Sequence, residues 1–420
     1  MIIKESKEQK VHEKDIKLDI RKQSEFHSNE IELIESAQLN IFNCNFEAWT
    51  AIGTNKAMAY STHGAFRYFG KFPPPIATYL ITQHTKEDDV VWDPMAGSGT
   101  TGVEAVLLNR NCILNDVSPL SRLLAKVKTK YIDPKLLEDA IERIQKNHRS
   151  MNEEEFPMES LEAINVNHWF LPETISSLRG LRFAIDQEKN DSIKDFLLVV
   201  FASTVRRVSR ATTQQGRLFL DVETASEDAI PTFLKRAKIA IAGVSSLPSH
   251  EKTLVSIIDH NLVKPLPSEY NETTDLVILH PPYFNSYKYS SVNSLELAWL
   301  GFDHAYIRKN EIREFFKIGK PEKVDFYVED MISVIKNVKS LLKPGGVIGL
   351  MIGDTIMKNN HIPVTKMILE EVQKMGLCIE NIALRVPKYT EATWVASQRR
   401  KSGDIGITLY DYVITLRRVN

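Results

Sequence analysis

Short apolar runs alternate with amphipathic segments from about residue 75 onward, and this alternation predicts strands that are separated by helices. Seven strands are predicted, at residues 89–95, 112–116, 253–259, 274–280, 347–354, 378–386 and 407–418. Helical spacing occurs between them, at 102–111, 328–342 and 363–375. Strands that alternate with crossover helices form an open, mostly parallel α/β sheet.

The alternation is interrupted between the second and third predicted strands. Residues 126–250 hold segments of helical period without strand alternation, so a large helical insert is predicted there. The first residues are rich in Lys and Glu and poor in large apolar side chains, which predicts a charged arm at 1–40. The main domain is then expected in two parts, at 41–125 and 251–420.

Composition narrows the class of protein. Of 420 residues, 43% are hydrophobic, which is enough for a sizeable core, and the formal net charge is −1. No apolar run of 18 residues and no signal-peptide core occur, so we expect a cytoplasmic protein that does not contact a membrane. The three cysteines, Cys44, Cys112 and Cys378, form no C-x-x-C pair, so neither a zinc site nor a disulfide framework is predicted, and no metal is expected.

With so little net charge, contacts to phosphates require local basic clusters. Candidates lie at 206–210, 235–238 and 398–401. For any single cluster, an ordinary solvent-exposed face is the more common explanation.

The stretch "DPMAGSGTTGVEA", residues 93–105, joins a predicted strand to a predicted helix. Its glycines, Gly97, Gly99 and Gly102, have the spacing G-x-G-x-x-G, which often marks a nucleotide-binding turn. Glycines allow the backbone to approach a ligand, and the helix that follows presents free N–H groups to an anionic group. Asp116 ends the next strand, where an acid can accept hydrogen bonds from ribose hydroxyls. The alternative is a tight turn that binds nothing.

A second motif, "HPPY" at 280–283, directly follows another predicted strand. Two prolines stiffen the turn and remove two backbone donors, which leaves the carbonyl of Pro281 able to point into a cleft. Tyr283 offers a flat face beside it. A rigid acceptor next to an aromatic ring can hold a planar base by its exocyclic amine, although a proline-ended strand with a core tyrosine would have the same sequence.

Together these motifs resemble those of the DNA amino-methyltransferases, which transfer a methyl group from S-adenosylmethionine to N6 of adenine or N4 of cytosine. "DPMAGSGTT" resembles the cofactor motif D-P-F-x-G-S-G-T-T, and "HPPY" stands where the family has D-P-P-Y, S-P-P-Y or N-P-P-Y. "HGAFRYFGKFPPPIATYLI" at 63–81, "NDVSP" at 115–119 and "IIDHN" at 257–261 resemble further segments of the family. The resemblance implies a Rossmann-like class I methyltransferase with a seven-stranded, mostly parallel sheet.

The resemblance also implies roles for individual residues. The catalytic residues would be His280, Pro281, Pro282 and Tyr283. The cofactor would contact Lys71, Phe72, Asp93, Pro94, Ala96, Gly97, Ser98, Gly99, Thr100, Thr101, Asp116, Val117, Asp259 and His280. Asp116 would bind the ribose, and Asp259 would bind the adenine amine of the cofactor.

His280 departs from the family, which has Asp, Asn or Ser at this position. A neutral imidazole can accept a hydrogen bond from the target amine, whereas an imidazolium cannot. Activity is therefore expected to fall as the pH drops through a pKa of ~6.5 if that pKa is unperturbed. The competing interpretation is that His280 only packs the end of the strand.

The predicted substrate is double-stranded DNA with a flipped target base, because neither amine is accessible in the stack. Cytosine N4 is favoured over adenine N6, since an uncharged residue replaces the acid and the cofactor motif precedes the P-P-Y motif. An RNA base methyltransferase, a nicotinamide-dependent dehydrogenase and a degenerate binding subunit remain alternatives. The insert is a candidate for target recognition, dimerisation or bracing of the fold. A cognate restriction enzyme is a candidate partner, and either a monomer or a homodimer is compatible with the sequence.

Overall fold

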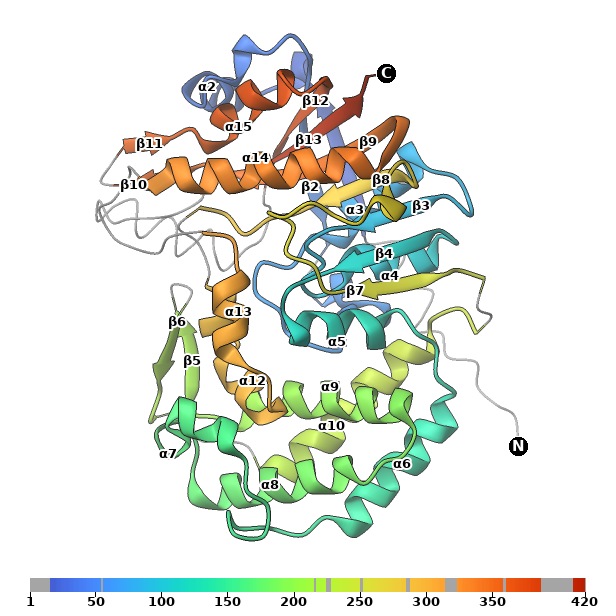
Figure 1. Ribbon diagram of the computed structural model, residues 1–420, viewed down its shortest axis with the longest axis vertical. Coiled ribbons are helices and arrows are strands. Elements are labelled where there is room, and N and C mark those ends of the chain that lie inside the picture. Colours follow the sequence, from blue (N-terminus) through green and yellow to red (C-terminus); the bar gives the residue numbers. More distant parts are fainter. Residues whose placement is uncertain are drawn as a thin grey trace.

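The chain has an α/β architecture in which helices cover both faces of one large sheet (Figure 1). The computed structural model describes residues 16–53, 56–214, 217–223, 228–249, 252–284, 288–313, 323–357, 360–386 and 411–419. Among these residues the main sheet has nine strands, in the order β1 (Lys17–Lys22), β2 (Asn45–Ile52), β12 (Leu377–Arg385), β13 (Asp411–Arg418), β9 (Leu342–Gly353), β8 (Thr274–Leu279), β3 (Val90–Asp93), β4 (Asn111–Asn115) and β7 (Val255–Ile258). Strands β9, β8, β3, β4 and β7 are parallel to one another, whereas β13 is antiparallel to both of its neighbours.

The predicted count of seven strands is wrong, because the N-terminal segment adds β1 and β2 to the sheet. Strand β1 pairs antiparallel with β2, and β2 pairs parallel with β12. In β1, Leu18 and Ile20 pack against the core while charged residues alternate with them. Residues 17–40 are therefore part of the fold and not a charged arm, and residues 1–15 lie outside the described part.

Each face of the sheet buries one set of alternating side chains. Val91, Leu276 and Ile278 pack against helices α3 (Pro74–His84), α4 (Thr100–Leu107) and α5 (Pro119–Lys128). Trp92 and Val277 belong to a second cluster, against α2 (Ser28–Ser36), α14 (Val324–Leu341) and α15 (Val364–Gln373). This period of two is what a central strand needs when both faces are covered.

The stretch predicted as a helical insert forms α6 (Pro134–Asn147), η6 (Glu159–Ile164), α7 (Val166–Trp169), α8 (Pro172–Asp186), α9 (Asp191–Val208) and α10 (Ala229–Ser245), and it also contains an antiparallel hairpin of β5 (Ala211–Gln214) and β6 (Arg217–Leu220). Figure 1 shows these helices gathered beside the β7 edge of the sheet. One apolar cluster joins them to α5 and to α12 (Ser294–Leu300). The insert therefore shares its core with elements that flank the glycine turn, while the predicted domain boundaries stay a prediction.

The remaining elements are short. They are η2 (Gln23–Glu25), η3 (Leu39–Ile41), η4 (Ala57–Ala59), η5 (Ser61–Gly64), η7 (Ser268–Tyr270), α11 (Tyr289–Val292), α13 (His304–Asn310) and the pair β10 (Thr355–Met357) and β11 (Asn360–Ile362). Within the described ranges, none of the helices has the length and apolar character that crossing a membrane requires.

Candidate active site

A cavity opens at the carboxyl ends of β3, β4, β7 and β8. Chain order reverses here, since β3 has β4 on one side and β8 on the other, and such switch points are where open α/β sheets bind ligands. The cavity is lined by Tyr68, Gly70, Lys71, Phe72, Asp93, Pro94, Met95, Ala96, Gly97, Ser98, Thr100, Asn115, Asp116, Val117, Ser118, His260, Asn261, Leu262, His280, Pro282, Tyr289, Ile307, Asn310, Glu311 and Ile312. The structure thus brings together twelve of the predicted site residues, and Gly99, Thr101, Asp259, Pro281 and Tyr283 are not part of the lining.

The glycine turn adopts a backbone conformation that glycine accommodates readily. Gly97 and Gly99 have φ values of +48° and +74°, in the left-handed region that favours glycine. A Cβ atom on Gly97 would lie 3.2 Å from the ring of Tyr68, and one on Gly99 would lie 3.0 Å from the backbone of Ala125 in α5. Gly97 therefore faces the cavity, whereas Gly99 permits the close approach of α5. Gly102 allows α4 to pack closely on Leu114 of β4.

Asp116 holds the glycine turn in place. Its carboxylate accepts the backbone N–H of Gly97 at 2.9 Å and that of Ser118 at 2.8 Å. Burial raises its pKa to about 6, and these two hydrogen bonds oppose that rise. Burial likewise raises the pKa of Asp93 to about 7. A carboxylate with further lone pairs at this position can still accept hydrogen bonds from ribose hydroxyls.

Asp259 lies away from the cavity. Its half-exposed carboxylate forms an ion pair with Arg122 at 2.8 Å. The residues that follow it, His260 to Leu262, line the cavity instead. Asn115 places them, because its side chain donates to the carbonyls of Pro94 at 2.9 Å and His260 at 3.0 Å and accepts the His260 N–H at 2.8 Å. Its place directly before Asp116 was the one signal in the sequence that could have identified Asn115.

His280 extends β8 and reaches the cavity. One ring nitrogen, Nε2, lies 3.2 Å from the hydroxyl of Tyr283, and the Phe72 ring centre lies 5.4 Å from the imidazole. Burial lowers the pKa of His280 to about 3, with a smaller contribution from the positive charge of Arg385. The imidazole is therefore neutral at ordinary pH, and the expected titration near ~6.5 does not belong to this residue.

The two prolines differ in their contacts. The carbonyl of Pro282 accepts the hydroxyl of Tyr327 at 2.8 Å. The carbonyl of Pro281 has no hydrogen-bond partner among the described residues. It is thus the acceptor of the motif that remains available, although Pro281 itself is buried behind the cavity lining.

Two aromatic rings that sequence reasoning missed line the cavity. Tyr68 and Tyr289 stack with their ring centres 5.7 Å apart and their planes inclined by 19°. The hydroxyl of Tyr68 lies 3.1 Å from that of Ser121. Tyr68 lies within the "HGAFRYFGKF" stretch, so its place three residues before Lys71 was the available signal.

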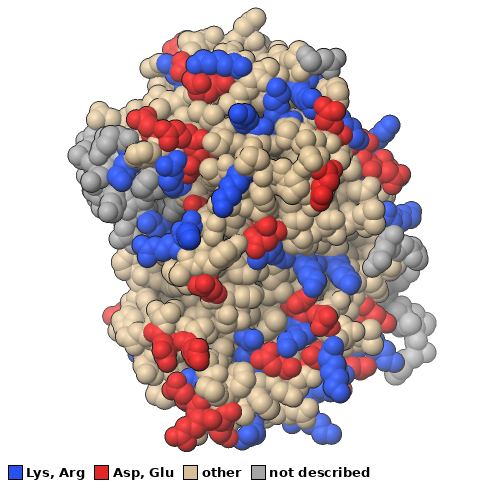
Figure 2. Space-filling model, viewed as in Figure 1, with Lys and Arg blue, Asp and Glu red and all other residues tan. Residues whose placement is uncertain are grey.

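The described basic clusters are divided between the interior of the fold and its surface, where Lys235 and Lys238 are exposed. Arg206 pairs with the buried Glu296 at 2.9 Å, and Arg236 donates to two backbone carbonyls. Arg207 is exposed. The cluster at 398–401 lies outside the described residues. Figure 2 shows acidic and basic side chains intermingled on the face it draws, in agreement with the near-zero net charge.

A family model of N6/N4 methyltransferases, described as DNA methylase, matches residues 2–122 and 274–401. The chain belongs to this DNA methylase family. The matched ranges contain the glycine turn and the H-P-P-Y motif, and residues 126–250, the predicted insert, lie entirely between them.

Two relatives of this DNA methylase are type II methyltransferases. M.MvaI of Kocuria varians is 27% identical over 303 residues, which cover 66% of each chain. M.BsoBI of Geobacillus stearothermophilus is 27% identical over 278 residues, which cover 59% of this chain and 54% of the relative. The alignments thus span just under two thirds of the first relative and about half of the second.

Among solved structures, a SAM-dependent methyltransferase of Methanosarcina mazei is 9% identical, with a TM-score of 0.31 over 81% of this chain and 96% of that chain.

Proposed function

We propose that this DNA methylase transfers a methyl group from S-adenosylmethionine to the exocyclic amine of a flipped base in double-stranded DNA, with cytosine N4 as the target. The observation that carries the proposal is the meeting of the glycine turn and the H-P-P-Y motif at one cavity. The type II relatives support DNA as the substrate.

The lining of the cavity fits the proposed cofactor. Asp116 would accept from the ribose hydroxyls, and Lys71 would face the carboxylate. Gly97 keeps open the space beside Tyr68 that a side chain would fill. The bound cofactor would supply an electrophilic methyl group. The carboxylates of Asp93 and Glu311 give the same cavity an acidic side that suits the cofactor's positive charges.

In the proposed mechanism, His280 and Pro281 hold the hydrogens of the target amine. A lone pair delocalised into the base makes this amine a poor nucleophile, and two acceptors would favour the pyramidal nitrogen that can attack. The neutral imidazole suits this role, because an imidazolium could not accept. If the Tyr283 hydroxyl donates to Nε2, then Nδ1 carries the ring proton and neither nitrogen is left to accept from the amine. Acceptance then requires the other tautomer, in which Nε2 carries the proton, or a rotation of Tyr283.

Orientation would supply most of the acceleration, since placing reactants in line contributes ~7–11 kcal/mol. A flipped base would lose its stacking in the duplex, and an aromatic ring restores ~1–3 kcal/mol per base. We propose that the flipped base stacks on the ring of Tyr283.

The test is methylation of unmodified plasmid DNA with labelled S-adenosylmethionine, followed by digestion to nucleosides and mass analysis. N4-methylcytosine is the expected product. N6-methyladenine would move the target to the alternative amine and leave the rest of the proposal intact. If a reaction that contains both RNA and DNA transfers the label to the RNA and not to the DNA, the RNA alternative is favoured. Binding of NADH in place of S-adenosylmethionine would overturn the proposal.

A further inference from the structure

The helical insert packs on the two segments that carry the stacked tyrosines of the cavity. Helix α10 packs on η5, and α9 packs on α12. The chain runs from η5 into the stretch that carries Tyr68, and α12 follows α11, which begins at Tyr289. Tyr68 lies beside the glycine turn, and Tyr289 comes after the H-P-P-Y motif. The insert therefore contacts a cofactor half and a base half of the same cavity.

Arg236 of α10 holds the cofactor half. Its guanidinium donates to the carbonyls of Gly64 at 3.0 Å and Ala65 at 2.9 Å. Ala65 lies three residues before Tyr68. A planar guanidinium that donates to two successive carbonyls fixes the direction of the backbone as well as its distance. The insert thus determines how the chain enters the stretch that lines the cavity.

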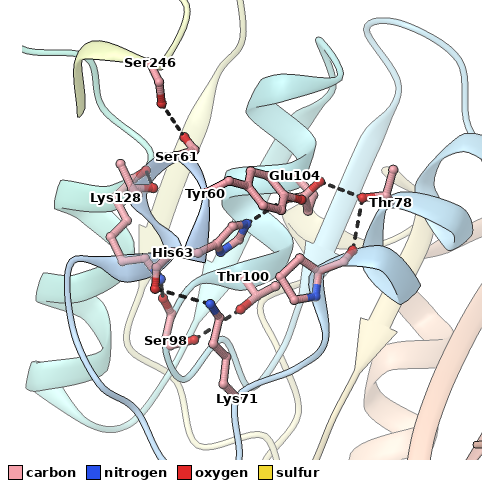
Figure 3. A network of polar contacts seen from close by, with 12 residues as sticks. Tyr60, Ser61, His63, Lys71, Thr78, Ser98, Thr100, Glu104, Lys128 and Ser246 are labelled. Atoms are coloured by element: carbon pink, nitrogen blue, oxygen red, sulfur yellow. Dashed lines mark hydrogen bonds and ion pairs between the residues drawn. The ribbon is translucent and has the colours of Figure 1, made fainter. Parts of the chain in front are cut away.

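The contact of α10 with η5 extends beyond this arginine. The hydroxyls of Ser246 and Ser61 lie 2.9 Å apart, and a Cβ atom on Gly243 would lie 2.6 Å from the carbonyl oxygen of Ser61. On its other side, η5 is held by α4, where the Glu104 carboxylate lies 2.6 Å from Nε2 of His63. Figure 3 shows the contacts that join Ser61 to Ser246 and His63 to Glu104. Two helices therefore fix η5, and one of them belongs to the insert.

Arg206 of α9 holds the base half. Its guanidinium forms a bidentate ion pair with Glu296 of α12, with both N–O distances at 2.9 Å, and it also donates to the carbonyl of Val292. The side chain of Glu296 is only 2% exposed. Val292 ends the short helix α11 that begins at Tyr289. The buried ion pair therefore keeps the arginine in one position, from which it fixes the end of α11.

One helix joins the two contacts. The Nε of Arg236 donates to the hydroxyl of Ser203 in α9 at 2.7 Å, and Ser203 lies one turn before Arg206. Both arginines lie outside the cavity lining. The backbone that leads to Tyr68 and the backbone that begins at Tyr289 are thus connected through a single turn of α9.

We propose, building on the function above, that the insert sets the distance between the cofactor half and the base half of the cavity. Arg236 positions the stretch of Tyr68, and Arg206 positions the helix of Tyr289. Both are positioning residues, because they act through the stacked tyrosines and not on a ligand. Methyl transfer needs the reacting atoms about 3–3.5 Å apart, so a displacement of either half slows the reaction.

The experiment measures two quantities on the full chain. One is the Kd of S-adenosylmethionine by calorimetry, and the other is the single-turnover rate of DNA methylation at saturating cofactor. Arg236→Met is expected to raise the Kd about tenfold, because two hydrogen bonds to the cofactor half are lost. Ile239→Met, on the exposed face of the same helix, is the matched control and leaves both quantities unchanged.

The base half is tested by replacing both members of the ion pair, Arg206→Met together with Glu296→Met. This removes the contact with Val292 and leaves no unpaired buried charge, and such replacements are often neutral for stability. The double variant is expected to lower the single-turnover rate about tenfold and to leave the Kd of S-adenosylmethionine unchanged. A role of Arg206 in stability alone would shift the unfolding midpoint and leave the rate at the parent value, which overturns the inference.

Gly243→Ala keeps the test decisive if Arg236→Met does not fold. Alanine is the better helix former, but its Cβ would meet the Ser61 carbonyl, so α10 and η5 must separate and the Kd should rise. An unchanged Kd in the folded α10 variants overturns the inference, as does an equal change of Kd and rate in every variant. A parent that binds S-adenosylmethionine and methylates no DNA would instead overturn the proposed function, while the Kd values still test Arg236.

Discussion

Protonation of His280 should be opposed by the fold, and this can be measured both as stability and as activity. The folded-state pKa is about 3, against ~6.5 for a free imidazole. At ~1.4 kcal/mol per unit, the folded environment disfavours the charged ring by about 4–5 kcal/mol. Between these two pKa values the unfolded chain binds more protons than the folded one, so stability rises with pH across that window and falls as the solution is acidified. From pH 7 to pH 5 the expected loss attributable to His280 is about 2 kcal/mol.

The assay is urea unfolding at pH 7 and pH 5 for the parent and for His280→Asn, which keeps a neutral polar side chain. His63 is also held neutral, but it contributes equally to both proteins and cancels in the comparison. The variant should lose about 2 kcal/mol less than the parent on acidification. The same pH dependence in both proteins would refute the assignment.

Single-turnover methylation at saturating cofactor gives the second readout. His280 should produce no acid limb near pH 6.5, since its ring is already neutral there. An acid limb from Asp116 or Asp93, whose pKa values lie at about 6 and about 7, would persist in His280→Asp. A limb near pH 6.5 that is present in the parent and absent from that variant would show that His280 titrates after all.

Three further changes separate structural from functional roles. Gly99→Ala should destabilise the protein by more than Gly345→Ala in urea unfolding. Both glycines have positive φ, which costs an alanine ~1–2 kcal/mol, but only at Gly99 would the new Cβ lie 3.0 Å from a backbone atom. Equal losses of stability would mean that α5 can shift to make room. Tyr283→Phe removes the hydroxyl that can accept from Nε2 and so hold the His280 tautomer whose Nδ1 accepts from the amine; it should therefore slow the chemical step and leave cofactor Kd unchanged, and a weaker cofactor Kd would contradict that separation. Arg207→Ala should reduce the log–log salt slope of DNA binding by ~0.9 without shifting the unfolding midpoint, and an unchanged slope would place this exposed arginine outside the DNA interface.

The sequence predicted the strands whose apolar runs are continuous, because a strand covered on both faces needs no polar positions. Strand β1 was missed because four of its six residues are charged, and only Leu18 and Ile20 show the alternation. The hairpin of β5 and β6 was missed because each of its strands has only four residues and both lie between long helical segments. Local pattern therefore identified the strands from β12 across to the β7 edge of the main sheet, and it missed the opposite edge, which β1 and β2 form.

For the site, the sequence predicted correctly which segments meet at the cavity, but not which individual residues of those segments line it. The glycine turn and His280 reach the same cavity because parallel strands end at the same edge of a sheet. Asp259 itself is not part of the cavity lining, whereas His260, Asn261 and Leu262 are, since β7 ends at Ile258 and the chain then turns these residues inward. The buried hydrogen bonds of Glu104 with Tyr60, His63 and Thr78 could not be predicted, because these residues are distant in sequence and their burial is decided only by packing.

The order of strands has a consequence for synthesis of the protein. Strand β3 lies between β4 and β8, and the backbone of Val90 is held by Asp275, 185 residues later in the chain. At ~5–20 residues per second, the ribosome delivers that partner roughly 10–40 seconds after β3 has emerged. During this interval one edge of β3 and the apolar face around Trp92 have no cover, and β2 waits longer still for β12. The nascent chain is therefore expected to depend on chaperone binding, and a slower stretch of translation before β8 should lower the yield of native protein.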